Sequence, residues 1–330
     1  MTRLRHTSPD QPGWTRRRSG RGFRYLDADG ASVPAEERDR IQQLAIPPAW
    51  EDVWICPQPN GHLQAVGTDQ AGRRQYLYHP SWREQRDAEK FERSTELGRR
   101  LGRTRSRVAA DLDTDGVPLE RACAAAFRLL DLGCFRVGND IYADEHGSFG
   151  LTTLERRHVR KRGDALAFHF VGKSGVEHHL TISDPESVAA LSAMRRRRSD
   201  DPSLLAFREG RRWRALNSTL VNAYISEVTG LGVSAKDFRT WHASVVAASS
   251  LAMSGVQTAA ARRRRAIRQA MDDAAALLGN TPTQARTSYV DPRLVDLYEE
   301  GSTMDARLAA RAAGEAISRP AELAVLRLLG

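Results

Sequence analysis

The stretch FHFVGKSGVEHHL, residues 168–180, contains the tripeptide GKS with which a phosphate-binding P-loop ends. That motif needs a glycine five positions before its second glycine, but Ala167 stands five positions before Gly172. Apolar residues alternate with smaller or polar ones on both sides of residues 172–175, which is typical of two strands joined by a tight turn. The stretch therefore predicts a β-hairpin with Lys173 at its tip, and we expect no nucleotide-binding loop.

Outside this hairpin, the second half of the chain has a helical pattern. Helices are predicted over residues 119–132, 217–230, 234–253 and about 258–278, and the tail predicts a packed helix pair broken at Pro320. Most of these segments carry apolar residues at helical spacing and end at a glycine or before a proline. We expect this half to be mainly α.

The first part of the chain has a different pattern. Residues 22–33 are typical of a strand, a turn and a strand, and residues 52–79 alternate as several short antiparallel strands. A long charged helix over 82–112 connects the two parts. We therefore predict an α+β fold with a small β-rich N-terminal domain and a larger, mainly α domain. The expected divisions are a basic flexible arm at 1–20, a β-rich domain at 21–90 and a mainly α domain at 91–330.

The charge favours a polyanionic partner. The 330 residues carry a formal net charge of +9, and nucleic acid is the commonest soluble polyanion. Only four of the 50 basic residues are lysines, and Lys173 is one of them. Since lysine can lose a proton and arginine effectively cannot, a retained lysine in such a chain indicates proton transfer.

Several classes of protein are not expected. No apolar run approaches the ~20 residues that span a bilayer, and the N-terminus lacks an apolar signal region, so we expect a cytoplasmic protein. The three cysteines, Cys56, Cys123 and Cys134, have no metal-type spacing. Metal binding by them or by the pair His178-His179 is not expected.

Four stretches of the second domain carry candidate chemistry. They are CFRVGND with Arg136, VGKSG with Lys173, KDFRTWHAS with Arg239, and LGNTPTQARTSYVDPR with Asn280 and Tyr289. Together they resemble the type IB DNA topoisomerases, in the compact poxvirus-like form also found in bacteria. The resemblance covers roughly residues 20–300, because residues 47–83 look like that family's DNA-clamping N-terminal domain.

The resemblance implies a role for each of these residues. Tyr289 would attack a backbone phosphorus to form a 3′-phosphotyrosine bond, and Lys173 would protonate the leaving 5′ oxygen. Arg136 and Arg239 would hold the nonbridging oxygens of the transition state. Asn280 stands where the poxvirus enzymes have histidine, and its amide can donate a hydrogen bond but cannot carry a proton.

The resemblance also implies how the protein works as a whole. It would relax supercoiled double-stranded DNA by nicking and resealing one strand, as a monomer that clamps around the duplex in the nucleoid. No nucleotide, metal or other cofactor is implied. Basic and aromatic residues on one predicted strand would face the major groove: Arg73, Arg74, Gln75, Tyr76 and Tyr78. Strand alternation puts Gln75 and the tyrosines on opposite faces.

Alternatives stay open at this point. Tyr289 has a structural alternative as a core aromatic, and Asn280 as a helix-cap companion of Gly279. The arginine runs 195–198 and 262–265 are expected to be solvated helix faces or phosphate contacts. A tyrosine recombinase shares the same residue types, although it normally carries a helical domain first. A catalytically silent DNA-binding protein is the alternative from another class.

Overall fold

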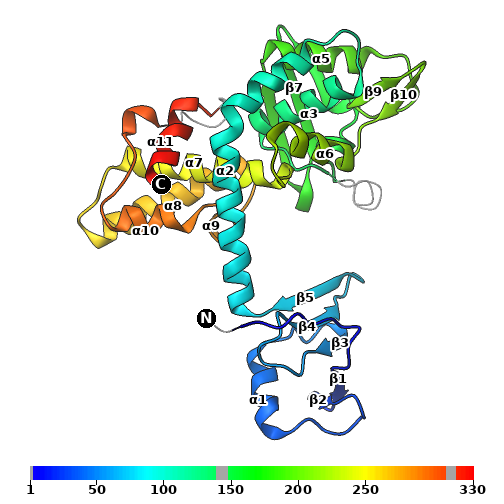
Figure 1. The fold of residues 1–330 in the computed structure, drawn as a ribbon, viewed down its shortest axis with the longest axis vertical. Helices are drawn as coiled ribbons and strands as arrows, with labels where there is room; N and C mark the ends of the chain where they lie inside the picture. Colours follow the sequence, from blue (N-terminus) through cyan, green and yellow to red (C-terminus); the bar gives the residue numbers. More distant parts are fainter. Residues whose placement is uncertain (1–2, 139–147, 310–316) are drawn as a thin grey trace. The chain divides into compact units, whose positions relative to one another are not determined.

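The computed structural model of the protein describes residues 3–138, 148–309 and 317–330. The chain divides into two compact units, Met1–Glu89 and Lys90–Gly330. Helix α2 (Pro80–Leu112) runs across the division, and Figure 1 shows it as one long helix. Among the described residues, no helix combines the length and apolar character that crossing a bilayer requires.

The N-terminal unit is built on one antiparallel sheet. Its five strands run in the order β2-β1-β3-β4-β5, and helix α1 (Ala35–Gln43) lies between β2 and β3 in the chain. The core contains Val33, Ile41, Val53, Ile55 and Ala65. The strands are β1 (Trp14–Ser19), β2 (Gly22–Leu26), β3 (Glu51–Ile55), β4 (Leu63–Thr68) and β5 (Arg74–Tyr78).

The prediction of a flexible arm over residues 1–20 is wrong for the part that the structure describes. Strand β1 lies inside the sheet, paired with β2 on one side and β3 on the other. Nearer the terminus, Arg5 forms a bridge with Gly61, and the buried Thr7 donates to the carbonyl of Leu63 at 3.0 Å. The basic composition misled the prediction, because the backbone of β1 pairs while Arg17 and Arg18 stay exposed and the Arg16 guanidinium donates to backbone carbonyls, including that of Pro47 at 3.0 Å.

The C-terminal unit is mainly helical, so the predicted α+β class is confirmed. Its helices after α2 are α3 (Leu119–Gly133), α5 (Pro185–Arg196), α6 (Ser218–Thr229), α7 (Ala235–Ser254), α8 (Ala260–Leu278), α9 (Pro282–Ser288), α10 (Pro292–Glu299) and α11 (Arg319–Leu329). Pro320 lies in the first turn of α11, preceded by a short 3-10 turn at Ala306–Leu308. The first helix of the predicted C-terminal pair falls largely outside the described residues.

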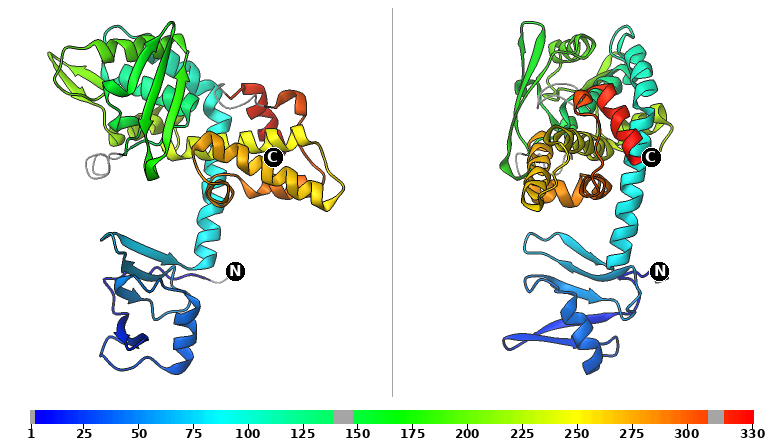
Figure 2. Two further views of the ribbon diagram at one scale, coloured as in Figure 1. Left: turned by 180° about the vertical axis from the view of Figure 1, so that it is seen from behind. Right: turned by 90° about the vertical axis from the view of Figure 1, so that its left-hand side faces the viewer.

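Two small sheets accompany these helices. The larger contains β6 (Val159–Arg162), β7 (Ala165–Val171) and β8 (Glu177–Ile182), and the smaller contains β9 (Ala206–Glu209) and β10 (Arg212–Ala215). Figure 2 shows the larger sheet as a layer at one side of this unit. Strands β7 and β8 pair antiparallel from Leu166↔Ile182 to Val171↔Glu177, so the predicted hairpin is confirmed.

Helix α7 is the centre of the C-terminal unit. Almost all of its residues are buried, and it packs on α8, α3, α10 and α11. At its start, the Ser234 backbone N–H donates to the Asp237 carboxylate at 2.8 Å, and Arg93 of α2 also contacts Asp237, at 3.0 Å. Trp241 lies so close to Gly98 of α2 that a Cβ there would stand 2.4 Å from the indole. The buried side chains of this central helix are therefore held in place by the helices around it.

Candidate active site

Arg239 lies at the floor of the candidate site, on the second turn of α7, with 3% of its surface exposed. Its guanidinium donates to two backbone carbonyls, that of Cys134 and that of Leu278, the second at 2.9 Å. Cys134 is the residue after α3 and Leu278 is the last residue of α8, and the last carbonyls of a helix have no partner within the helix. The buried arginine therefore caps two helices and is held rigidly by them.

The two helix ends have the backbone geometry that this arrangement needs. Gly279 follows α8 with φ 59°, and Cys134 follows α3 with φ 50°. The left-handed conformation is usual for glycine but uncommon for a residue with a Cβ. Since Cys134 is buried and its carbonyl accepts from Arg239, the surrounding contacts hold it in that conformation.

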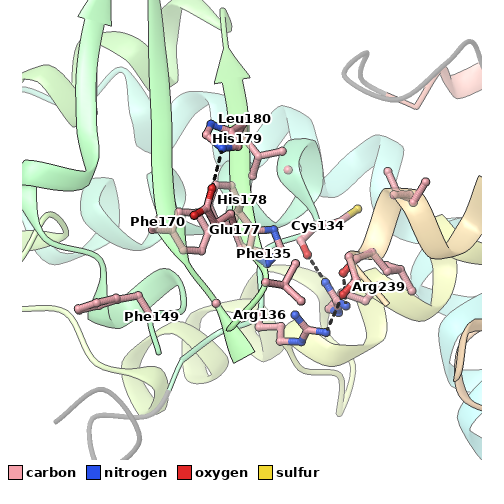
Figure 3. A pocket seen from close by; sticks show the side chains of 17 residues that line it. Cys134, Phe135, Arg136, Phe149, Phe170, Glu177, His178, His179, Leu180 and Arg239 are labelled. Carbon is pink, nitrogen blue, oxygen red and sulfur yellow. Dashed lines mark hydrogen bonds and ion pairs between the residues drawn. The ribbon is translucent and has the colours of Figure 1, made fainter. Parts of the chain in front are cut away.

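Arg136 lies beside this floor, half-buried, in the segment just after α3. It donates to the side-chain oxygen of Asn280 and lies 3.5 Å from the carbonyl oxygen of Gly279. Burial, and then the charge of Arg239, lower the pKa of Arg136. Figure 3 shows the two arginines side by side. Two guanidinium groups held together in this way favour an anion between them.

Two buried donors at this place have no acceptor at full hydrogen-bond geometry within the described residues. They are Nε of Arg239 and Nδ2 of Asn280, although both side chains lie close enough to the Tyr289 hydroxyl to influence its pKa. Buried polar groups are normally paired, so donors that no protein acceptor satisfies are typical of a place where a ligand supplies the acceptors. The donors match the oxygens of a phosphate group better than a cation or an apolar ligand.

Tyr289 is the residue that ends α9, and its ring is half-buried against Arg239. The centre of the ring lies 5.3 Å from the Arg239 guanidinium carbon. Ser244 of α7 fixes the backbone here, since its hydroxyl donates to the Tyr289 carbonyl at 3.3 Å and accepts from the Asp291 N–H at 3.0 Å.

The environment of Tyr289 favours its ionised form. Burial of the phenol is the largest single influence and would raise its pKa, but the other influences together outweigh it, first among them the charge of Arg239. The charge of Arg136 and donor groups of Arg239 and Asn280 act in the same direction, so the pKa of Tyr289 lies below its ordinary value. A lowered pKa makes a phenol a better nucleophile near neutral pH.

Lys173 is not brought into this cluster. It lies exposed in the 3-10 turn Lys173–Gly175 at the tip of the β7–β8 hairpin, where Ser174 has φ 65°. The N–H of Gly172 donates to the Val176 carbonyl at 2.8 Å and closes the turn. Gly172 and Val176 line the pocket in front of Arg136 and Arg239, so Lys173 is attached at the rim of that pocket.

His178 is a site residue that the sequence reasoning missed. It stacks on Phe170 with ring centres 5.0 Å apart, and it faces Gly172 and Gly279, where an added Cβ would stand 2.7 and 2.8 Å from the imidazole. Burial, and then the charges of Arg136 and Arg239, lower the pKa of His178, which favours the neutral imidazole. The period-two alternation of strands could have identified His178 as a residue of the inner face. It places His178 on the same face as its partner Phe170, and His179 on the opposite face.

A network of buried charges supports the floor from behind. His242 of α7 lies with its Nδ1 3.3 Å from Cys134 Sγ and its Nε2 3.4 Å from Asp131 Oδ1. Arg105 bridges Asp131 and Glu322 with contacts of 2.8 Å on each side. Full burial would lower the pKa of His242, but Cys134 and Asp131 outweigh it and raise that pKa. The network connects α2, α3, α7 and α11 behind the candidate site.

The N-terminal candidates lie on two faces of β5. Arg74, Tyr76 and Tyr78 share the exposed face, and the two tyrosine rings stack with centres 6.2 Å apart. Gln75 lies on the other face and donates to Asp69 at 2.9 Å, as the predicted alternation requires. Arg73, just before the strand, pairs with Asp69 at 2.9 Å, and its backbone and side chain lower the pKa of that carboxyl to about 2.

The arginine runs differ from the expectation in one residue. Arg197 is 6% exposed, and its guanidinium donates to several backbone carbonyls, including that of Met194 at 3.0 Å and that of Leu204 at 3.3 Å. It closes the end of α5 and is unavailable to solvent or to a phosphate. Residues 262–265 are exposed on α8 except for Arg263, which is half-buried.

Comparisons with known proteins agree with this geometry. A family model described as "Eukaryotic DNA topoisomerase I, catalytic core" matches residues 79–309. A second, described as "Bacterial DNA topoisomerase IB, N-terminal domain", matches residues 22–69. The first match contains Arg136, Lys173, Arg239, Asn280 and Tyr289.

Similar curated proteins carry related names. The chain is 27% identical to the DNA topoisomerase 1B of Acanthamoeba polyphaga mimivirus over 295 residues, covering 87% of this chain and 88% of that protein. It is 29% identical over 150 residues to the DNA topoisomerase 1B of vaccinia virus, covering 43% and 46%. The match to DNA topoisomerase 1 of Schizosaccharomyces pombe is 28% identical over 169 residues, covering 51% of this chain but 20% of the yeast protein.

Proposed function

The chain belongs to the type IB DNA topoisomerases, and from this premise we propose that it relaxes supercoiled duplex DNA through a covalent 3′-phosphotyrosine intermediate. It is an enzyme of DNA, and its chemistry would lie at Tyr289 and the residues around it. The observation that carries the proposal is the contact between Tyr289 and Arg239. The half-buried phenol ring has its centre 5.3 Å from the guanidinium carbon of this buried arginine. A core aromatic would not need this charge beside it.

In the proposed first step, the Tyr289 oxygen attacks a backbone phosphorus after the phenol has lost its proton to water. The P–O bond to tyrosine forms while the bond from phosphorus to the 5′ oxygen breaks, and the electron pair leaves with that oxygen. The charge of Arg239 favours the phenolate that begins this step.

Arg136 and Arg239 would stabilise the negative charge on the nonbridging oxygens as the phosphorus becomes five-coordinate. A guanidinium presents parallel donors at the spacing of phosphate oxygens, and a buried one needs little reorganisation during the reaction. The buried donors at Arg239 Nε and Asn280 Nδ2 support this assignment. Asn280 would contribute a neutral hydrogen bond, with no proton transfer.

Lys173 would give its proton to the leaving 5′ oxygen and take it back during resealing. Its place on the turn, between Gly172 and Val176 that line the pocket, supports a side chain that reaches the leaving group once DNA is bound. The energy of the broken phosphodiester stays in the tyrosine link, so the strand is rejoined by reversal of the same steps. None of them uses ATP or a metal ion.

We also propose that the protein acts as a monomer and that the exposed face of β5 contacts duplex DNA. Arg74 offers a charge for phosphate, and Tyr76 and Tyr78 offer hydroxyls and ring faces. Gln75 and Arg73 are bound to Asp69, which directs them away from a primary role in recognition.

The test is relaxation of supercoiled plasmid with EDTA present and ATP absent, comparing the intact chain with Tyr289→Phe. We expect relaxation by the intact protein, none by the variant, and a 3′-linked protein–DNA adduct when the reaction is stopped with detergent. The phenyl ring keeps the packing against Arg239, so the variant should still bind DNA.

Other outcomes point to the rival functions. DNA binding without relaxation or adduct in either protein would favour a silent DNA-binding protein. An adduct confined to one DNA sequence, without plasmid relaxation, would favour a recombinase. Relaxation that persists in Tyr289→Phe would exclude Tyr289 as the nucleophile.

A further inference from the structure

The outer face of the β7–β8 hairpin carries a group of side chains that the proposed chemistry does not use: His169, Glu177 and His179. His169 and His179 are direct partners in the strand register, and Glu177 lies two residues before His179 on the same face. The imidazole rings stack with centres 4.3 Å apart. His178 points the opposite way, toward Arg136, so the two adjacent histidines serve different surfaces (Figure 3).

The three side chains converge on one point. Glu177 Oε2 lies 3.5 Å from His179 Nε2 and 3.8 Å from His169 Nε2. One ligand atom from each residue can be chosen so that all three lie within 4.8 Å of one another. Two donors bound to one tetrahedral zinc ion are about 3.3 Å apart, so small side-chain rotations bring this group to ligand spacing. Between 64% and 67% of each side chain is exposed, which leaves room for that movement.

We propose that His169, Glu177 and His179 form a binding site for a divalent transition-metal ion, Zn²⁺ in particular, with at least one coordination position left to water. Two imidazoles and one carboxylate are the donor set that zinc, copper and nickel prefer, whereas magnesium and calcium prefer oxygen alone. The proposal does not rest on the topoisomerase function.

Neighbouring charges set limits on the affinity. Arg157 and Arg160 line the same groove as His169 and His179, and their charges oppose a cation there. The coordination bonds and the Glu177 carboxylate act against this repulsion. The described cysteines, Cys56, Cys123 and Cys134, are all buried, so they do not compete for the ion in the folded protein.

A bound ion would join two strands next to the turn that carries Lys173. The pair His169↔His179 lies two pairs before Val171↔Glu177, which is the last pair of the hairpin. An ion held by both strands removes freedom from the end of the hairpin without touching the buried arginines. The site is therefore structural in kind, and it is compatible with a reaction that proceeds in EDTA.

The experiment is titration of the full chain, freed of metal by EDTA and then dialysed, with Zn²⁺ in a calorimeter. We expect saturable binding of one ion, with at least ~10-fold weaker affinity in His169→Ala and in His179→Ala, the range seen even for outer-shell partners of metal sites. Glu177→Gln should weaken binding as well. Arg160→Ala is the matched control on the neighbouring strand, and it should leave the affinity unchanged or increase it.

Hydrogen exchange gives a second measurement. Zn²⁺ should slow exchange of the amides of residues 171–176 in the intact chain and not in His179→Ala. Because the three ligands are exposed, the alanine variants should unfold at the same temperature as the intact apoprotein, which separates loss of the site from loss of the fold. The proposal is overturned if binding is not saturable, or if it persists unchanged when His169 and His179 are both replaced.

Discussion

Arg239 and Lys173 are two cations assigned to the same reaction, and the molecule holds them in opposite ways. Arg239 is buried and bonded to the carbonyls that end two helices, whereas Lys173 is exposed on a three-residue turn. A group that stabilises charge gains from being fixed before the reaction, because no reorganisation is then needed. A proton donor must reach an atom that arrives with the substrate. A mobile side chain can therefore still serve as the proton donor, whereas a mobile arginine would stabilise the transition state less well.

Chemistry also explains which cation is buried. Guanidinium has several donors in a plane and stays charged, so two carbonyls can satisfy part of it while an edge remains for phosphate. A buried lysine would lose its proton more readily and would present a point charge without that geometry. The comparison therefore predicts that a variant at Lys173 loses cleavage rate alone, whereas a variant at Arg239 loses both cleavage rate and stability.

Among variants that keep Tyr289, the largest effect is expected for Lys173→Ala. Cleavage of a DNA strand should slow about 10²–10⁴-fold, the usual contribution of a general acid, while thermal stability stays the same because the side chain is exposed. Lys173→Arg should be nearly as slow, since arginine effectively does not release its proton. Single-turnover cleavage measures both variants.

A substrate with sulfur in place of the leaving 5′ oxygen sharpens this prediction. A thiolate leaves without a proton, so the Lys173→Ala variant should cleave it at close to the rate of the intact enzyme. A defect of the same size on both substrates would assign Lys173 to binding instead of proton transfer.

Arg239→Ala should reduce both rate and stability. Loss of one charge-stabilising donor usually slows catalysis about 10²–10³-fold. The carbonyls of Cys134 and Leu278 would also lose their partner, at about 1–3 kcal/mol for each buried group left unpaired. Urea unfolding and single-turnover cleavage measure the two losses. A variant that is slow but fully stable would contradict the capping role.

The buried network extends the comparison to pH. Burial would raise the pKa of Asp131, but Arg105 and His242 outweigh it and hold that pKa well below its usual range. Because the folded pKa is below the unfolded value of about 3.9, the stabilisation is complete above that pH and is lost as the pH falls below it. At neutral pH, Asp131→Asn should cost about 3–5 kcal/mol, as for a broken buried ion pair.

Urea unfolding at pH values between neutral and acid tests this sign. The intact protein should lose more stability on acidification than Asp131→Asn, so the two curves should converge at low pH. Curves that stay parallel would show that Asp131 is not the group that titrates.

Asn280→Ala should have a smaller effect, about tenfold on cleavage, because a neutral amide contributes a hydrogen bond of about 0.5–1.5 kcal/mol. The rate should show no new dependence on pH, since the amide does not titrate. Asn280→His is the informative partner: an imidazole here should add a pH dependence near its own pKa.

The smallest effect is expected on the N-terminal sheet. Arg74→Ala should weaken duplex binding a few-fold and reduce the slope of log affinity against log salt by about 0.9, the contribution of one phosphate contact. Gln75→Ala, on the opposite face of β5, is the matched control and should leave the slope unchanged. Equal slopes for the intact chain and Arg74→Ala would remove this face from the DNA contact.

Local structure followed from local sequence. The alternation around Gly172 predicted the β7–β8 hairpin, and the segment 234–253 predicted α7, because side-chain period is decided by near neighbours. The same reasoning failed for β1. Whether a basic strand pairs or stays free depends on the strands beside it. One of the two partners of β1, strand β3, begins more than thirty residues later in the chain.

The sequence by itself determined the residue types of the proposed reaction and the elements that carry them: an arginine on a helix, a lysine on a hairpin turn and a tyrosine in the segment after α8. Only the tertiary structure decided which groups are buried and what they contact. The acceptors of Arg239 lie 105 and 39 residues away in the chain, and His178 became part of the site by facing Gly279. The burial and hydrogen bonding of Arg239 depend on helix ends that are distant in the chain and adjacent in the fold. A local sequence pattern contains no information on that contact.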